Sequence, residues 1–165
     1  MEANDKKLFI KMVISAWDAQ NASITKLLGN LSDEQLLAET APGRNRGIYI
    51  IGHLTAVSDG MMKLLGFDRL YPKLDAVFIH APDRAASEMP SPSEVKEYWS
   101  RVNEKITLHT SQMRPDDWFA KHSAVSTEDF AKEPHRNKLN VLINRTNHHS
   151  YHLGQLIYLE KKSAE

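Results

Sequence analysis

Apolar residues recur at helical spacing in four stretches of the chain, which are separated by polar and proline-containing segments. The spacing predicts long helices over residues 6–28, 45–65, 91–112 and 137–160. A shorter helix is expected over 32–38, because Ser32-Asp33-Glu34-Gln35 fits a capping box. Ser91-Pro92-Ser93-Glu94 is a comparable start for the third long helix. No stretch reads convincingly as a strand, so the pattern indicates an all-α fold, a four-helix bundle with a short extra helix.

The connections between these helices are long. Residues 66–90 contain three prolines, yet their apolar side chains indicate a segment that packs against the helices. Connections of this length are uncommon unless they are functional or carry short structure of their own. We expect this segment to cover a pocket and to influence substrate choice. Composition changes nowhere along the 165 residues, which favours one domain over residues 1–165.

Charge and composition exclude several classes of function. Lys+Arg and Asp+Glu are both 21, so the formal net charge is zero and gives no footprint for nucleic acid or an anionic membrane. No apolar run is long enough to span a bilayer, and the polar N-terminus does not resemble a signal peptide, so we expect a cytoplasmic protein. The absence of cysteine excludes disulfides and a cysteine nucleophile. A metal site would have to use nitrogen and oxygen ligands.

The candidate chemistry lies in the last helix. His148 and His152 are four residues apart and would share one face, where two imidazoles can bind one metal ion. A third ligand would have to come from another element. His53 lies on an apolar stripe of the second long helix, where its ring needs either a buried backbone carbonyl or a metal. The pattern leaves both roles open.

Periodicity alone leaves the orientation of the last helix open. Leu139, Ile143, Thr146, Ser150, Leu153 and Ile157 fall on one stripe. His148 and His152 fall roughly opposite, so their face would border a cleft or a subunit interface, unless the helix is buried on both sides. His149 and His152 are an alternative pair. The Glu of His-Glu-x-x-His is missing, which argues against a metalloprotease.

Three segments resemble the DinB-like (DNA-damage-inducible) superfamily. They are Gly52-His53-Leu54, the run from His148 to Gln155, and the loop Pro42-Gly43-Arg44-Asn45. The resemblance covers essentially the whole chain. It implies that His53, His148 and His152 are the metal ligands and that His149 is their neighbour. Leu153 stands where many members have Arg, a departure that touches no ligand.

The resemblance also implies a fold and a range of activities. The expected fold is a four-helix bundle of distinctive topology that holds a divalent metal, zinc or nickel. The family is often dimeric, so a homodimer is one expectation for this chain. Its members include transferases and isomerases that depend on a low-molecular-weight thiol, and metal-dependent hydrolases.

Three imidazole ligands would leave the metal with an open position, as in catalytic rather than structural sites. A water molecule there would become a nucleophilic hydroxide, and a thiol there would become a thiolate. Without cysteine in the chain, the thiol must come from a small cosubstrate. The sequence therefore favours a transferase that adds such a thiol to a small electrophile. The alternatives are a metal-dependent hydrolase and a non-catalytic helical binding protein.

Four residues are candidates to orient the imidazoles or to contact a substrate. Asn144 lies one turn before His148, and Gln155 lies one turn after Tyr151. Asn45 near the start of the second long helix and His149 complete the set. For Asn45 the simpler role is a helix cap, and for Gln155 a partly exposed polar position.

Overall fold

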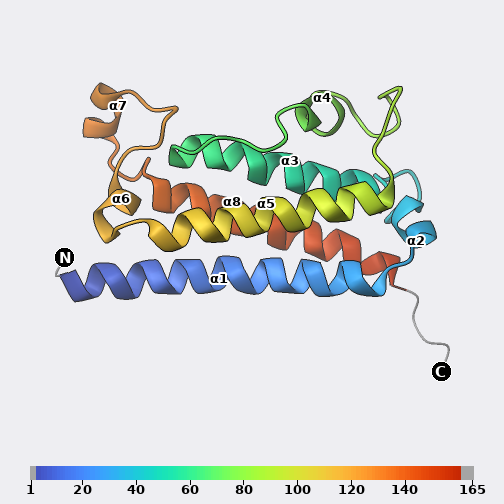
Figure 1. Cartoon of the computed structure of the whole chain (residues 1–165), viewed down its shortest axis with the longest axis horizontal. Helices are drawn as coiled ribbons and strands as arrows, with labels where there is room; N and C mark the ends of the chain where they lie inside the picture. Colours follow the sequence, from blue (N-terminus) through green and yellow to red (C-terminus); the bar gives the residue numbers. More distant parts are fainter. Residues whose placement is uncertain (1–2, 161–165) are drawn as a thin grey trace.

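The computed structural model describes residues 3–160, and within them the chain is helical, with two isolated backbone bridges and no strand. The all-α prediction is therefore confirmed for that range. Four long helices lie side by side (Figure 1). They are α1 (Ala3–Asn30), α3 (Gly47–Leu65), α5 (Pro92–Gln112) and α8 (Lys138–Leu156). Within residues 3–160, every helix is too short or too polar to cross a lipid bilayer.

Short helices occupy the connections. They are α2 (Asp33–Leu37), α4 (Leu74–Phe78), α6 (Pro115–Phe119), α7 (Thr127–Lys132) and a 3-10 turn, η1 (Ile157–Leu159). The sequence pattern predicted one short extra helix and so underestimated the number of short helices. Five or six residues make fewer than two helical turns, so α4, α6 and α7 leave no clear periodicity in the sequence.

The predicted caps form. The Ser32 hydroxyl accepts a hydrogen bond from the Gln35 amide (3.2 Å), and the Gln35 side chain accepts one from the Ser32 amide (2.9 Å). Ser91 and Glu94 make the same reciprocal pair ahead of α5. The start of α3 differs from its prediction, since Arg46 rather than Asn45 precedes the helix. The Arg46 amide donates to the Asp83 carboxylate (2.9 Å), so a distant residue caps this helix.

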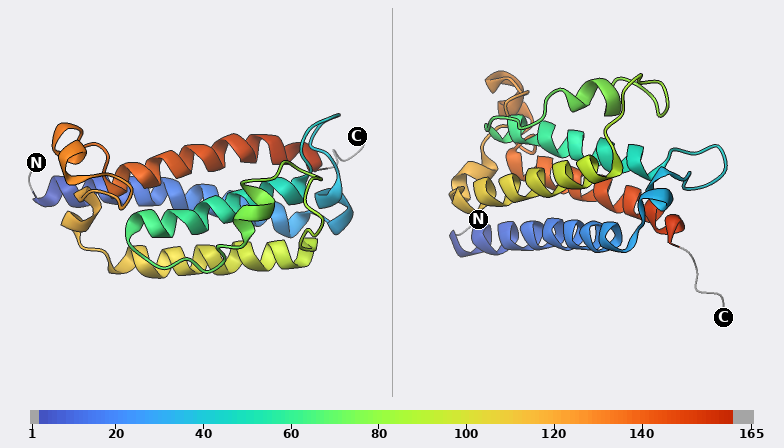
Figure 2. Two further views of the ribbon diagram at one scale, coloured as in Figure 1. Left: turned by 90° about the horizontal axis from the view of Figure 1, so that it is seen from above. Right: turned by 45° about the vertical axis from the view of Figure 1, so that its right-hand side comes forward.

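The order of the long helices explains the longest connection. α1 and α8 run in one direction, whereas α3 and α5 run in the other, as the colour gradient shows (Figures 1 and 2). Because α3 and α5 are parallel, residues 66–91 must return along the full length of α3, about 28 Å for its 19 residues. This crossover carries α4 over α3, and Leu74 and Phe78 of α4 are buried.

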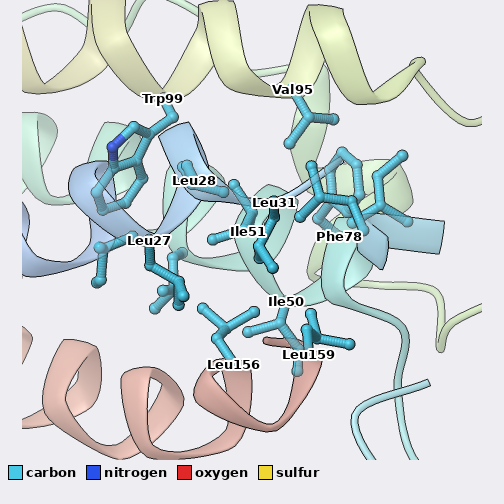
Figure 3. Close-up of a cluster of buried hydrophobic side chains, with 14 of the residues drawn as sticks. Leu27, Leu28, Leu31, Ile50, Ile51, Phe78, Val95, Trp99, Leu156 and Leu159 are labelled. Carbon is cyan, nitrogen blue, oxygen red and sulfur yellow. The ribbon is translucent and has the colours of Figure 1, made fainter. Parts of the chain in front are cut away.

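The buried face of α8 differs from the predicted stripe. Ser150 and Ile157 of that stripe are exposed, whereas His149 is wholly buried. The buried residues of this helix are Leu139, Val141, Leu142, His149 and Leu156. The prediction of this stripe as the buried face was wrong because α8 packs against α1 and α3 over a wide arc. Few strongly apolar residues mark the centre of that arc. Figure 3 shows Leu156 of this face among side chains from α1, α3 and α5.

A buried carboxylate holds the start of the crossover. Asp59 on α3 is fully buried and accepts hydrogen bonds from the Leu70 amide (2.7 Å), the Tyr71 amide (3.2 Å) and the Arg69 guanidinium (2.9 Å). Arg69 also binds Asp75 through two bonds of 2.6 and 2.7 Å. The network ties residues 69–75 to the middle of α3.

Asp59→Asn should lower the free energy of unfolding by about 3 kcal/mol, because an amide NH₂ would then face backbone N–H donors in a dry site. Urea denaturation followed by circular dichroism measures the change. Asp75→Asn is the matched control, since Asp75 shares Arg69 but keeps 27% of its side chain exposed and should cost much less. Equal losses in the two variants would contradict this account.

Candidate metal centre

Three imidazole rings from two helices converge at one point. The Nε2 atom of His148 lies 3.3 Å from that of His53 and 3.0 Å from that of His152. His53 comes from α3, and the other two come from successive turns of α8. One ligand nitrogen of each of the three residues lies within 4.8 Å of the others, and the side chains are half-buried. The structure thus brings together the three predicted ligands.

Hydrogen bonds fix which nitrogen of two rings faces the centre. The Nδ1–H of His53 donates to the backbone carbonyl of Phe78 (2.8 Å), and that of His152 donates to the side-chain oxygen of Gln155 (2.8 Å). A neutral imidazole that donates through Nδ1 carries its lone pair on Nε2. The backbone-carbonyl interpretation of His53 is confirmed, and because the other ring nitrogen faces the cluster, the metal-ligand interpretation remains a prediction compatible with it.

The donor set fits a divalent transition metal. Tetrahedral coordination at a zinc–nitrogen distance of about 2.0–2.1 Å places two ligand nitrogens about 3.3 Å apart, which is close to the spacing here. Hydrogen bonding satisfies the cluster less well. His148 can donate a single Nε2–H, either to Nε2 of His53 or to Nε2 of His152. The lone pair of the other ring is then left without a hydrogen-bond donor. A cation accepts all three lone pairs together.

Burial favours the neutral form of His148 and His152. It lowers the pKa of His148 to about 4, and the neighbouring charges of His152, His53 and Arg145 act in the same direction. Burial also lowers the pKa of His152, and the hydrogen bond that its ring donates to the Gln155 side-chain oxygen acts in the opposite direction. A metal ligand must be the neutral imidazole, so protonation does not compete with a metal at these two rings near pH 7.

Phe78 reaches His53 because residue 52 has no side chain. A Cβ atom on Gly52 would overlap the Phe78 ring, which is fully buried. Figure 3 shows that ring close to Val95 and in the same cluster as Ile51. Tyr49 reinforces the placement, since its hydroxyl donates to the Ala81 carbonyl (2.8 Å). Glycine inside a helix costs stability, and here it admits the residue that orients a ligand.

His149 is separated from the cluster. It is fully buried on the core side of α8, and its Nε2 pairs with the Ser58 hydroxyl at 3.0 Å. Its ring lies 4.6 Å from that of Trp17 and 5.5 Å from that of Trp99. Burial lowers the pKa of His149 to about 3. The structure thus places His148, rather than His149, beside His152 and His53.

The other candidates lie in different places. Gln155 contacts His152 directly, whereas Asn144 is exposed and makes no side-chain hydrogen bond within residues 3–160. Asn45 lies in the wall of a cavity beside His152. That cavity is bordered by residues 40–45 and by the end of α8. No lining residue comes from 66–90, so the segment expected to cover a pocket supplies the Phe78 carbonyl that binds His53 and no part of this wall.

Carboxylates are absent from the cluster. In the described part of the chain, no Asp or Glu oxygen joins the three histidines. Three acidic residues on α3 and on the flanking connections form ion pairs: Asp59 with Arg69, Asp83 with Arg46 (2.6 Å) and Glu39 with Arg84 (2.6 Å). The centre therefore offers neutral nitrogen ligands and no evident general base.

The comparisons agree with this helical architecture and these histidines. The sequence profile of the DinB superfamily matches residues 16–156, which include His53, His148 and His152. The chain belongs to the DinB superfamily. A search of curated proteins found no match to it.

Sequence reasoning did not find two determinants of the centre, the Phe78 carbonyl and the close approach that Gly52 allows. A carbonyl contact between residues 25 positions apart leaves no local pattern. Gly52 did leave one, because a glycine inside a predicted apolar helix commonly marks a close approach of another element.

Gly52→Ala should weaken zinc binding by about tenfold or more, because displacing Phe78 removes the partner of His53. Competition with a chromophoric chelator measures the affinity. Gly60→Ala is a close control, since it adds a methyl group to the same helix at a position with no heavy atom within 4 Å. It should leave the affinity unchanged. If both variants bind zinc as the parent does, Phe78 does not control the site.

His149→Met should make the metal-free protein less sensitive to acid. The folded-state pKa of His149 is about 3, whereas an unfolded histidine titrates near about 6.5. Below about pH 6.5 the unfolded chain therefore binds a proton at this histidine, whereas the folded chain does not. As the pH is lowered, the free energy of unfolding decreases by up to about 1.4 kcal/mol per pH unit. Loss of the Ser58 contact adds an offset, but the slope should decrease by about one proton.

Urea denaturation between pH 7 and pH 4 measures that slope, with His135→Met at an exposed position as the control. An unchanged slope in His149→Met would show that the buried imidazole is not the group responsible.

Proposed function

We propose that this protein is a metal-dependent enzyme that adds a low-molecular-weight thiol to a small electrophilic molecule, with zinc or nickel as the metal. The observation that carries the proposal is the convergence of three imidazoles, with no carboxylate among them within residues 3–160. When bound there, a divalent metal would acidify a thiol or a water molecule that takes its open position.

The residues of the chain have distinct parts in this proposal. His53, His148 and His152 hold the metal through Nε2. The Phe78 carbonyl and the Gln155 amide keep the first and third rings in the required tautomer. After the thiol cosubstrate loses its proton, its sulfur uses the freed electron pair to form the new bond to the carbon of the electrophile. The leaving group departs with its own bonding pair, and solvent takes the thiol proton.

The lack of a carboxylate at the three-histidine cluster favours a thiol over water as the nucleophile. Metal-dependent hydrolases commonly pair the metal with a general base, such as the Glu of His-Glu-x-x-His. Here no Asp or Glu oxygen joins the three histidines within residues 3–160. A thiol coordinated to the metal is deprotonated outright and needs no such base. The protein has no cysteine, so the thiol would be a second substrate.

The first test is metal analysis of the purified, untagged protein beside the His148→Ala/His152→Ala double variant. We expect about one zinc or nickel per chain in the parent and none in the variant. The second readout is conjugation of simple thiols to a bimane halide, which releases halide and becomes fluorescent. The thiol-dependent rate should fall by more than about a hundredfold in the double variant.

Each other outcome has a distinct meaning. Hydrolysis of an ester without thiol would indicate a metal-dependent hydrolase. Metal without turnover of either kind would favour a binding protein. A parent that takes up neither zinc nor nickel would contradict the metalloenzyme altogether.

A further inference from the structure

The cavity beside the metal centre has a volume of about 560 Å³, which suits a small molecule. It lies between residues 40–45 and the C-terminal part of α8. His152 and Gln155 form part of its wall, and they also hydrogen-bond to each other. Of the three clustered histidines, His152 lines the cavity, so the cavity adjoins the cluster on the His152 side.

One positive charge stands in this wall without a counter-charge. Among the described lining residues, Arg44 carries the only formal charge, with His152 neutral. Its side chain is exposed and makes no ion pair within residues 3–160. Glu39, whose carboxylate accepts a hydrogen bond from the adjacent Gly43 amide (2.9 Å), forms its ion pair with Arg84 instead. A negative group entering the cavity would meet an unneutralised guanidinium.

The rest of the wall offers surfaces for an uncharged body. Tyr151 and Tyr158 are exposed by 65% and 76%, and both line the cavity. The amide of Asn45 and the hydroxyl of Thr40 lie in the same wall and can hydrogen-bond. Phenol rings with a few polar groups are typical of sites for small organic molecules.

We propose that this cavity binds a carboxylate-bearing small molecule, with its carboxylate on Arg44 and its reacting end at the histidine cluster. The inference rests on the proposed function and names the class of its substrate. The planar guanidinium matches a carboxylate through two parallel hydrogen bonds. A phosphate would need more positive donors, and the start of α3 is already occupied by Asp83.

A second cation near the centre makes the assignment testable. Arg145 lies on α8 one turn before His149, is partly buried, and its Nε has no hydrogen-bond partner within the described residues. It does not line the cavity. An anion drawn to Arg145 would therefore bind elsewhere.

The test compares hexanoate with hexanamide, which differ in charge but little in shape, on the zinc-loaded and the metal-free protein. Binding is followed by NMR shifts of the backbone amides of residues 40–46 and 151–158. Hexanoate should bind about fivefold more tightly than hexanamide, both with and without zinc. Arg44→Gln should abolish that preference, and Arg44→Lys should keep part of it. Arg145→Gln should leave it unchanged.

Three results would overturn the proposal. The preference for hexanoate over hexanamide could survive Arg44→Gln, it could disappear with Arg145→Gln, or it could exist only with zinc bound. The last would place the carboxylate on the metal. A separate titration of the cobalt-loaded protein with mercaptohexanol, an uncharged thiol, tests the proposed function. Absence of a thiolate-to-cobalt absorption band would count against thiol chemistry, whereas the hexanoate result would still decide the role of Arg44.

Discussion

The structure depends on one electrostatic constraint: three imidazole nitrogens face one another in a half-buried place. With Nδ1 of His53 bound to a carbonyl and Nδ1 of His152 bound to an amide oxygen, both rings turn lone pairs toward His148. One N–H on His148 can satisfy only one of them. The arrangement is therefore better suited to a cation than to a polar core. If the three Nε2 atoms did not converge, the hydrogen bonds at Nδ1 would not indicate a cation site.

The helix order supplies part of this centre. Because α3 and α5 are parallel, the chain must return over α3, and that path brings the Phe78 carbonyl to His53. Gly52 allows the approach, and Asp59 fixes the beginning of the path further along the same helix. A connection required by topology thus also orients a ligand. This coupling links the stability of the crossover to the geometry of the metal centre.

Sequence reasoning succeeded where the determinants are local. The capping boxes at Ser32 and Ser91 and the spacing of His148 and His152 lie within one helical turn, so they can be read directly. It failed where distant residues decide. The stripe on α8 was misplaced because threonine and serine matched the spacing, while the true buried face includes a histidine. That His149 is buried depends on Ser58 and two tryptophans from other helices.

Two successive histidines show how position on a helix sets chemistry. His148 and His149 differ by about 100° around α8. His149 turns into a dry core, where a hydroxyl and indole rings hold it neutral, and it contacts no solvent. His148 turns to a half-buried site where two other imidazoles meet it. Imidazole ligands carry no negative charge, so a divalent ion held by these three rings would keep its full positive charge. Under the proposed function, that charge is what would favour a thiolate over the neutral thiol at the metal.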